Sequence, residues 1–282
     1  MPLELTAEAT SRTVKTKNWE IHYHEAGQGH PLVMLHGSGP GATGWSNFGP
    51  NLRSLANDFR VIAVDMPGWG ASDAVIPDER DHVEAALQLL DALKIDKAAF
   101  VGNSMGGFNS VSFAVKHPDR ISHLITMGAG APGVRPSIFA PGNGLSEGLK
   151  ILLRGYQNPS METIRDVVDI MTYDSAFVTD ELISERLDAT LGRPDHLANF
   201  LAGGFEKISR AVITADDLVG IRVPTLVFHG RDDRVVHYEN SLKLVSLVPD
   251  SRLVLMNRCG HWLQLEYADE FNRLVGGFVS AR

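Results

Sequence analysis

The heptapeptide Val101-Gly-Asn-Ser-Met-Gly-Gly107 places a serine among glycines at the junction of a predicted strand and a predicted helix. Residues 97–101 form an apolar run typical of a buried strand, and residues 108–116 carry a helical pattern that ends at His117-Pro118. A sharp turn favours glycine on both sides, because a Cβ there would collide with the neighbouring strand or helix. The pattern fits a plain turn, or a nucleophile elbow that exposes Ser104 and aims the following amide at developing negative charge.

Length, composition and charge restrict the class of protein. The 282 residues are 44% hydrophobic, which is enough for a substantial core in one large or two small domains. The net charge is −8, from 26 basic and 34 acidic residues without a basic run, which argues against nucleic acid or an anionic membrane as partner. The first twenty residues lack the apolar core of a signal peptide, and no segment approaches the roughly 20 apolar residues of a membrane span. We therefore expect a cytoplasmic protein, without an intramolecular disulfide because Cys259 is its only cysteine.

Strand and helix patterns alternate from residue 31 onward. The predicted strands cover residues 31–35, 60–65, 97–101 and 121–127. Regular alternation of this kind predicts an α/β fold with a mostly parallel sheet and helices on both faces. Residues 19–26 instead suit an antiparallel outer strand, on which we expect His22 and His24 to be surface histidines rather than metal ligands. Asp65, at the end of a strand, is expected to stabilise a turn rather than to act as a catalytic acid.

The alternation stops after residue 127. Six glycines and three prolines lie in residues 128–148, and helical patterns follow without a strand between them. Strand patterns return at residues 223–228 and 253–256, before a final helix at about 267–279. The sequence therefore predicts a core domain formed by residues 1–132 and 213–282, and a helical cap domain formed by residues 133–212.

The loops after the last two strands carry acidic and histidine residues. Asp232 and Asp233 follow the first of these strands, and His261 follows the second. Because residues past the carboxyl ends of parallel strands gather along one edge of the sheet, Ser104, one of these aspartates and His261 are expected to meet there. Their order, Ser then Asp then His, is that of the α/β-hydrolase fold. The histidine would take the serine proton and the carboxylate would fix the imidazole tautomer, so the sequence predicts a catalytic triad.

A second loop suits the same chemistry. His36-Gly-Ser-Gly-Pro-Gly-Ala42 follows the strand at 31–35 and can turn several backbone N–H groups toward one point. It is a candidate oxyanion hole, or alternatively only a tight turn.

Over nearly its whole length the chain resembles the meta-cleavage product hydrolases, which are α/β-hydrolases that cleave C–C bonds in bacterial aromatic degradation. The resemblance is carried by His36–Ala42, Trp45-Ser-Asn47, Gly102–Gly107, Gly230-Arg-Asp-Asp-Arg234, Cys259-Gly-His-Trp262 and Asp269–Arg273. It implies Asp233 rather than Asp232 as the triad acid, and the amides of Ser38 and Met105 as the oxyanion hole. The position of Ser38 is often glycine in relatives, but only its N–H is needed. The resemblance also implies substrate contacts from Gly37, Gly39, Asn47, Asn103, Arg186 and Trp262.

The activity that the resemblance implies is hydrolysis of a 6-substituted 2-hydroxy-6-oxohexa-2,4-dienoate, a small anionic substrate, to 2-hydroxypenta-2,4-dienoate and a carboxylic acid. Neither a metal nor an organic cofactor is expected. A homodimer or larger homo-oligomer is compatible with the resemblance, and the identity of the 6-substituent stays open. The alternatives are a carboxylesterase or perhydrolase-like member of the fold, and a ligand-binding member with low turnover.

Arg186 also stands out from the residues alone. On a predicted helix over residues 180–191, it falls on the same face as Ile183, Leu187 and Thr190, opposite three acidic residues. One interpretation is an arginine that extends from the edge of the apolar stripe or pairs with a core carboxylate. The other is a guanidinium on the inward face of the cap, above a site for an anionic substrate.

Overall fold

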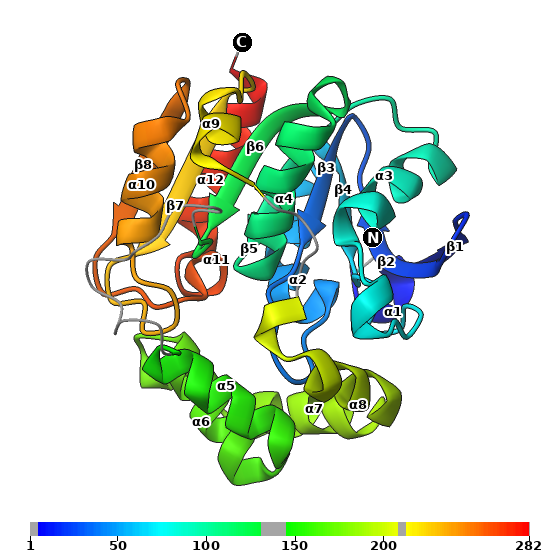
Figure 1. Ribbon diagram of the computed structural model, residues 1–282, viewed down its shortest axis with the longest axis vertical. Helices are drawn as coiled ribbons and strands as arrows, with labels where there is room; N and C mark the ends of the chain where they lie inside the picture. Colours follow the sequence, from blue (N-terminus) through cyan, green and yellow to red (C-terminus); the bar gives the residue numbers. More distant parts are fainter. Residues whose placement is uncertain (1–4, 131–144, 208–212, 282) are drawn as a thin grey trace.

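The computed structural model describes residues 5–130, 145–207 and 213–281, which contain an eight-stranded sheet (Figure 1). Its strands are β1 Ser11–Lys15, β2 Glu20–Ala26, β3 His30–Leu35, β4 Phe59–Val64, β5 Ala98–Asn103, β6 Ile121–Met127, β7 Thr225–Gly230 and β8 Ser251–Met256. They lie in the order β1-β2-β4-β3-β5-β6-β7-β8. β2 pairs antiparallel with β1 and β4, and all pairs from β4 to β8 are parallel. The predicted α/β-hydrolase class of fold is confirmed.

Helices pack on both faces of the sheet and bury two separate apolar clusters. Alternate residues of β3 divide between these clusters: Val33 and Leu35 enter one, and Leu32 and Met34 enter the other. The first cluster lies against α3 His82–Ala92, α4 Met105–Lys116, α9 Ala215–Val219 and α10 Glu239–Leu247. The second lies against α2 Gly44–Leu55, α11 Leu263–Glu266 and α12 Ala268–Ser280. Strands buried on both faces explain the continuous apolar runs in the sequence.

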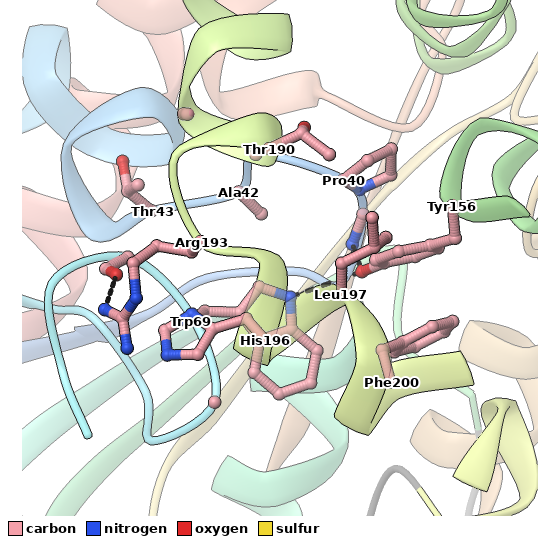
Figure 2. Close-up of a pocket in the computed structure, with 15 residues that line it drawn as sticks. Pro40, Ala42, Thr43, Trp69, Tyr156, Thr190, Arg193, His196, Leu197 and Phe200 are labelled. Carbon is pink, nitrogen blue, oxygen red and sulfur yellow. Dashed lines mark hydrogen bonds between the residues drawn. The ribbon is translucent and has the colours of Figure 1, made fainter. Parts of the chain in front are cut away.

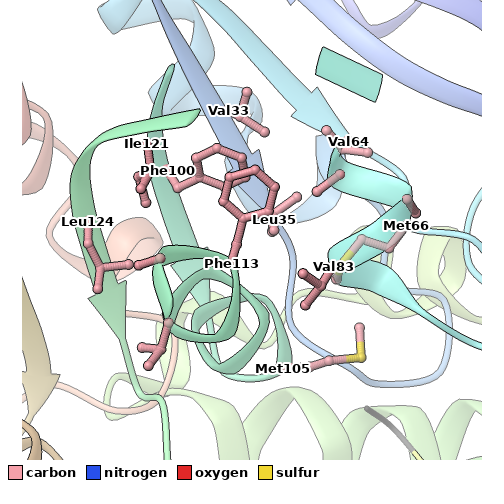
Figure 3. Packing of buried hydrophobic residues seen from close by; sticks show 14 of the residues in the cluster. Val33, Leu35, Val64, Met66, Val83, Phe100, Met105, Phe113, Ile121 and Leu124 are labelled. Carbon is pink, nitrogen blue, oxygen red and sulfur yellow. The ribbon is translucent and has the colours of Figure 1, made fainter. Parts of the chain in front are cut away.

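The packing of α4 on the sheet holds the junction that carries Ser104. Phe113 of α4 stacks on Phe100 of β5 with ring centroids 4.3 Å apart, and both side chains are fully buried (Figure 3). Burial of aromatic side chains of this size stabilises a fold by about 1.5–3 kcal/mol each. The strand and helix on either side of Ser104 are therefore fixed by the core itself.

Two expectations about the outer strands need correction. The antiparallel edge of the sheet is β1 rather than residues 19–26. The sequence did not predict β1 because its residues are mostly polar and exposed and show no apolar pattern. His22 and His24 are not surface histidines: Nδ1 of His22 lies 2.8 Å from Oδ2 of Asp65, and His24 is only 5% exposed, with Nδ1 3.1 Å from Oγ1 of Thr10. Oδ2 of Asp65 also accepts a hydrogen bond at 2.9 Å from the Ala71 amide in the loop after β4, so its predicted role in stabilising a turn is confirmed.

Four longer helices follow β6 in the described chain: α5 Glu147–Gln157, α6 Met161–Met171, α7 Asp180–Leu191 and α8 Pro194–Gly203. Serine or threonine side chains cap the first turns of α5, α6 and α7, which explains where these helices begin. The four helices pack on one another beyond the end of the sheet toward which the parallel strands point (Figure 1). The parts of the predicted cap at residues 133–144 and 208–212 lie outside the described residues. No helix in the described ranges is long and apolar enough to cross a membrane.

Candidate active site

Ser104 occupies a backbone conformation that non-glycine residues rarely adopt, with φ 50° and ψ −112°. Its amide donates to the Met127 carbonyl of the neighbouring strand at 2.8 Å, and its side chain is partly exposed. The flanking glycines are required by contact: a Cβ on Gly102 would lie 2.3 Å from the Gly106 oxygen, and a Cβ on Gly106 would lie 1.9 Å from the Leu35 oxygen. The nucleophile-elbow geometry predicted for this junction is therefore present.

His261 is hydrogen-bonded to one of the two candidate aspartates. Its Nδ1 lies 2.6 Å from Oδ2 of Asp233, while Oδ2 of Asp232 accepts from the Arg258 amide instead. Oδ1 of Asp233 accepts from the amides of Val235 and Val236 at 2.7 and 2.9 Å. Burial alone would raise the pKa of Asp233, but the imidazoles of His261 and His229 hold this pKa below its ordinary value. Asp233 is consequently a charged acceptor for the His261 ring.

The end of β6 brings the His261 ring to the edge of the sheet that carries Ser104. A Cβ on Gly128 would lie 2.8 Å from Nδ1 and Cε1 of His261 and 3.3 Å from Oδ2 of Asp233. Gly128 directly follows Met127, whose carbonyl accepts from the Ser104 amide. The three side chains therefore gather at the carboxyl edge of the sheet, as the chain order predicted.

The loop after β3 lies against this edge. A Cβ on Gly37 would lie 3.3 Å from the Ser104 Cβ and 2.6 Å from Oδ1 of Asn103. The Gly37 amide donates to Oδ1 of Asn47 at 3.2 Å, and Nδ2 of Asn103 donates to the His261 carbonyl at 3.3 Å. Asn47 and Asn103 therefore hold parts of the site in place through hydrogen bonds to neighbouring backbone.

Two backbone amides beside Ser104 are without hydrogen-bond acceptors. Within the described ranges, the N–H groups of Ser38 and Met105 make no hydrogen bond, although both residues are at most 9% exposed. Met105 opens α4, so its amide lies at the positive end of a helix dipole. Buried amides without protein acceptors are available to an oxygen of a bound molecule.

Arg186 is a buried cation beside the same loop. Its side chain projects from α7, its guanidinium carbon lies 4.8 Å from the ring centroid of Trp262, and Nη2 lies 3.0 Å from the position of a Cβ on Gly39. Arg186 is 4% exposed. Among the described residues its Nε has no hydrogen-bond partner, and no carboxylate forms an ion pair with it. Glu4 is the one Asp or Glu outside the described ranges. Burial lowers the pKa of Arg186 to about 10, so the guanidinium is charged at neutral pH.

Tyr156 of α5 is a contact that the sequence gave no reason to select. Its hydroxyl accepts hydrogen bonds from the Gly39 amide at 2.8 Å and from Nε1 of Trp69 at 3.3 Å, and its ring stacks on Phe200 at 3.6 Å. Burial raises the pKa of Tyr156 to about 12, so the hydroxyl is neutral. The residue ties α5 to the loop that carries Ser38.

Figure 2 shows a crevice lined by part of this loop, by Tyr156 and Trp69, and by residues of α8. It encloses about 370 Å³, open solvent included, and neither Ser104 nor His261 lines it. The crevice is therefore separate from the edge where the candidate catalytic side chains meet. Among the described residues, no group of three or more His, Cys, Asp or Glu could hold a metal ion.

Residues 32–274 match the alpha/beta hydrolase family. A serine at a strand-to-helix turn, with an aspartate and a histidine past the ends of two later strands, is the arrangement expected of that family. The chain belongs to the alpha/beta hydrolase family.

Several similar proteins indicate a particular group within this family. The chain is 42% identical to the 2-hydroxy-6-oxo-6-phenylhexa-2,4-dienoate hydrolase of Burkholderia cepacia, over 98% of this chain and 99% of that protein. It is 40% identical to 2-hydroxy-6-oxononadienedioate/2-hydroxy-6-oxononatrienedioate hydrolase 1 of Pseudomonas putida, again over 98% and 99%. A solved variant of the meta-cleavage product hydrolase from Pseudomonas fluorescens IP01 has a TM-score of 0.84 at 32% identity, over 95% of this chain and 96% of that one. The resemblance to meta-cleavage product hydrolases is confirmed.

Proposed function

We propose that this protein hydrolyses the C5–C6 bond of 6-substituted 2-hydroxy-6-oxohexa-2,4-dienoates, giving 2-hydroxypenta-2,4-dienoate and the carboxylic acid of the 6-substituent. The observation that carries the proposal is Arg186, a buried guanidinium that has no carboxylate partner in the described ranges and lies close to the loop beside Ser104. An unpaired buried cation is costly unless a ligand supplies the anion, and the dienoate carries a carboxylate. A neutral ester would leave this charge uncompensated.

Ser104, His261 and Asp233 would carry the chemistry. The dienolate first takes a proton at C5 to become the ketone, which gives the breaking C–C bond an electron sink. Attack on the C6 carbonyl, with His261 receiving the nucleophile's proton, then forms a tetrahedral oxyanion that the amides of Ser38 and Met105 would bind. Asp233 would hold the His261 tautomer, and collapse of the intermediate would release the dienol product and leave the carboxylic acid after reaction with water. None of these steps uses a metal or an organic cofactor.

The remaining predicted contacts would bind the dienoate. Arg186 would pair with its carboxylate, and Trp262 would present its ring beside that pair. Oδ1 of Asn103 is buried and has no partner in the described chain, so it could accept a hydrogen bond from the 2-hydroxyl group of the substrate. Asn47 would fix the peptide of Gly37, and the small residues Gly37 and Gly39 would leave room for the dienoate.

At the level of domains, residues 133–212 would form a cap over a core made of residues 1–132 and 213–282. α5–α8 support this division because they pack mainly on one another, at the end of the sheet where Ser104 lies. A cap of this kind would exclude water from the dienoate while the C–C bond breaks. We also propose a cytoplasmic location, which suits an acidic protein with one cysteine.

The test is a spectrophotometric screen of yellow ring-fission products whose 6-substituents are methyl, isopropyl, phenyl and a carboxylated chain. Loss of the dienolate absorbance reports turnover directly. We expect turnover of at least one compound, and a loss of roughly 10³-fold or more in the folded Ser104→Ala variant. Turnover of p-nitrophenyl esters without turnover of any dienoate would overturn the proposal.

A further inference from the structure

Asp233 lies within ion-pair distance of a second histidine besides His261. His229, the residue before the last of β7, is fully buried, and its Nε2 lies 3.2 Å from Oδ2 of Asp233. The same Nε2 lies 2.7 Å from the Val236 carbonyl oxygen, and Nδ1 lies 2.6 Å from Oγ of Ser241 in α10. His229 is therefore held on both sides of its ring, and one side faces the carboxylate.

These contacts place a proton on Nε2 of His229. Both neighbours of Nε2, the Val236 carbonyl and the Asp233 carboxylate, are acceptors, so Nε2 carries a proton. The hydroxyl of Ser241, which is 1% exposed, can donate to Nδ1. A ring with its proton on Nε2 satisfies every one of these contacts, and the hydrogen bond to Ser241 prevents the ring from turning away.

We propose that His229, locked by Ser241, is a positioning residue that donates an N–H to Asp233 and thereby limits how strongly this carboxylate binds the His261 proton. The inference rests on the proposed catalytic role of Ser104, His261 and Asp233. With His229, four N–H groups lie against the carboxylate: two backbone amides donate to Oδ1, the His261 ring lies 2.6 Å from Oδ2, and the His229 ring lies 3.2 Å from the same oxygen. Donors on one oxygen share its negative charge, so removing His229 strengthens the Asp233–His261 hydrogen bond and makes His261 more basic.

Other titratable groups lie around the pair and bear on any pH measurement. His237 and Glu239 lie on the α10 side, and Cys259 lies in the loop that leads to His261. Burial lowers the pKa of His237 and raises that of the Cys259 thiol, so both are neutral at pH 7. Neither group replaces the N–H that His229 directs at Oδ2 of Asp233.

The test compares His229→Leu, which removes the N–H, with His229→Gln, whose side-chain amide can donate from nearly the same place. The pH profiles of kcat and kcat/KM are measured with p-nitrophenyl acetate and with a dienoate. For His229→Leu we expect kcat to fall about 10-fold or more with KM within about threefold, and the acid limb of kcat/KM to move up by half a pH unit or more. His229→Gln should stay within about threefold of the wild type, with an unmoved limb.

The matched control is His24→Leu. His24 is also a buried histidine with a hydroxyl partner, Thr10, but it lies on β2, five positions from β7 in the strand order of the sheet. We expect a lower Tm and an unchanged pH profile. An unmoved acid limb in His229→Leu, or equal losses in His229→Leu and His229→Gln, would overturn the inference.

If His229→Leu does not fold, Ser241→Ala is measured in its place, because it removes only the hydroxyl that holds the His229 ring. Its acid limb should move in the same direction, and an unmoved limb contradicts the lock. The measurements with p-nitrophenyl acetate require the catalytic triad but not activity on a dienoate. Absence of dienoate turnover in the wild-type protein would therefore count against the proposed function alone.

Discussion

Ser104 and the His261–Asp233 pair are held in place by backbone at the end of β6, which lies far from all three residues in the sequence. The Met127 carbonyl anchors the strained Ser104 backbone, and the end of β6 leaves room for the His261 ring only because Gly128 has no side chain. Arg186 is the contrasting case: it is buried, yet no carboxylate in the described chain compensates its charge. Single substitutions at these positions test the proposed roles directly.

The two neighbouring aspartates should differ sharply on substitution. Asp233→Asn loses the charge that accepts the His261 Nδ1 proton and should lower kcat by about 10⁴-fold. Asp232→Asn keeps an oxygen that can accept from the Arg258 amide, and should leave kcat within a few-fold. Steady-state kinetics of both variants on one dienoate check this, and equal losses would show that the acid is misassigned.

Arg186→Gln should discriminate between an anionic and a neutral substrate. Leaving a desolvated substrate carboxylate unpaired costs about 2–5 kcal/mol, which corresponds to a loss of about 30-fold or more in kcat/KM for the dienoate. Hydrolysis of a neutral p-nitrophenyl ester should stay within a few-fold.

A suitable control for Arg186→Gln is Arg154→Gln, because the side chain of Arg154 is 55% exposed and pairs with Asp166 at the surface of the same group of helices. It should leave both activities unchanged. If Arg186→Gln instead lowers dienoate and ester turnover together, Arg186 supports the packing of α7 rather than the substrate.

The junction of β5 and α4 depends on how closely its backbone segments approach. Gly106 allows the first turn of α4 to touch the end of β3, at a distance that no Cβ permits. This contact, with the stacked pair Phe100 and Phe113, aligns strand and helix so that Ser104 is held in its strained turn. The strain at Ser104 is thus maintained by the packing of whole elements.

Gly106→Ala should therefore destabilise the fold. A Cβ 1.9 Å from the Leu35 oxygen forces β3 and α4 apart, and we expect the free energy of unfolding to fall by about 3 kcal/mol or more. Gly277→Ala in α12 is the matched control, since its Cβ meets nothing within 4 Å and should stabilise by about 0.5–1 kcal/mol. Urea denaturation measures both, and an unchanged midpoint for Gly106→Ala would contradict the packing argument.

Several buried histidines make the stability of the whole molecule depend on pH. Burial lowers the pKa of His82 to about 3 and of His196 to about 4, against an ordinary value of 6.5. Between these values the unfolded chain binds protons that the folded chain does not, so stability decreases as the pH falls from about 6.5 toward 4. The lowered pKa values of Asp65 and Asp233 remove further stability only at lower pH, where these carboxylates become protonated.

The expected slope is up to about 1.4 kcal/mol per pH unit for each such histidine. His82→Gln removes one of them and retains a side-chain N–H that can donate to the Pro67 carbonyl, which now lies 3.0 Å from Nε2. Urea denaturation at pH 7, 5.5 and 4.5 should give a shallower loss of stability in this variant than in the wild type. Parallel curves would show that His82 is already accessible to protons in the folded state.

The amino-acid sequence determined much of the fold by itself. Apolar runs in strands buried on both faces, and helical patterns between them, predict the parallel part of the sheet because burial on two faces requires it. The order of Ser104, Asp233 and His261 predicts their meeting, since parallel strands end at a common edge. Motif resemblance selected Asp233 over Asp232, and the described hydrogen bond to His261 agrees.

Only the tertiary structure decided which polar residues become partners across the chain. His22 and His24 read as surface residues from their alternating strand, but Asp65 and Thr10 approach them from other segments. The contact of Tyr156 with the Gly39 amide is equally long-range, spanning 117 positions. Local sequence patterns record which face of an element is apolar, whereas a hydrogen bond between distant segments depends on how the elements pack.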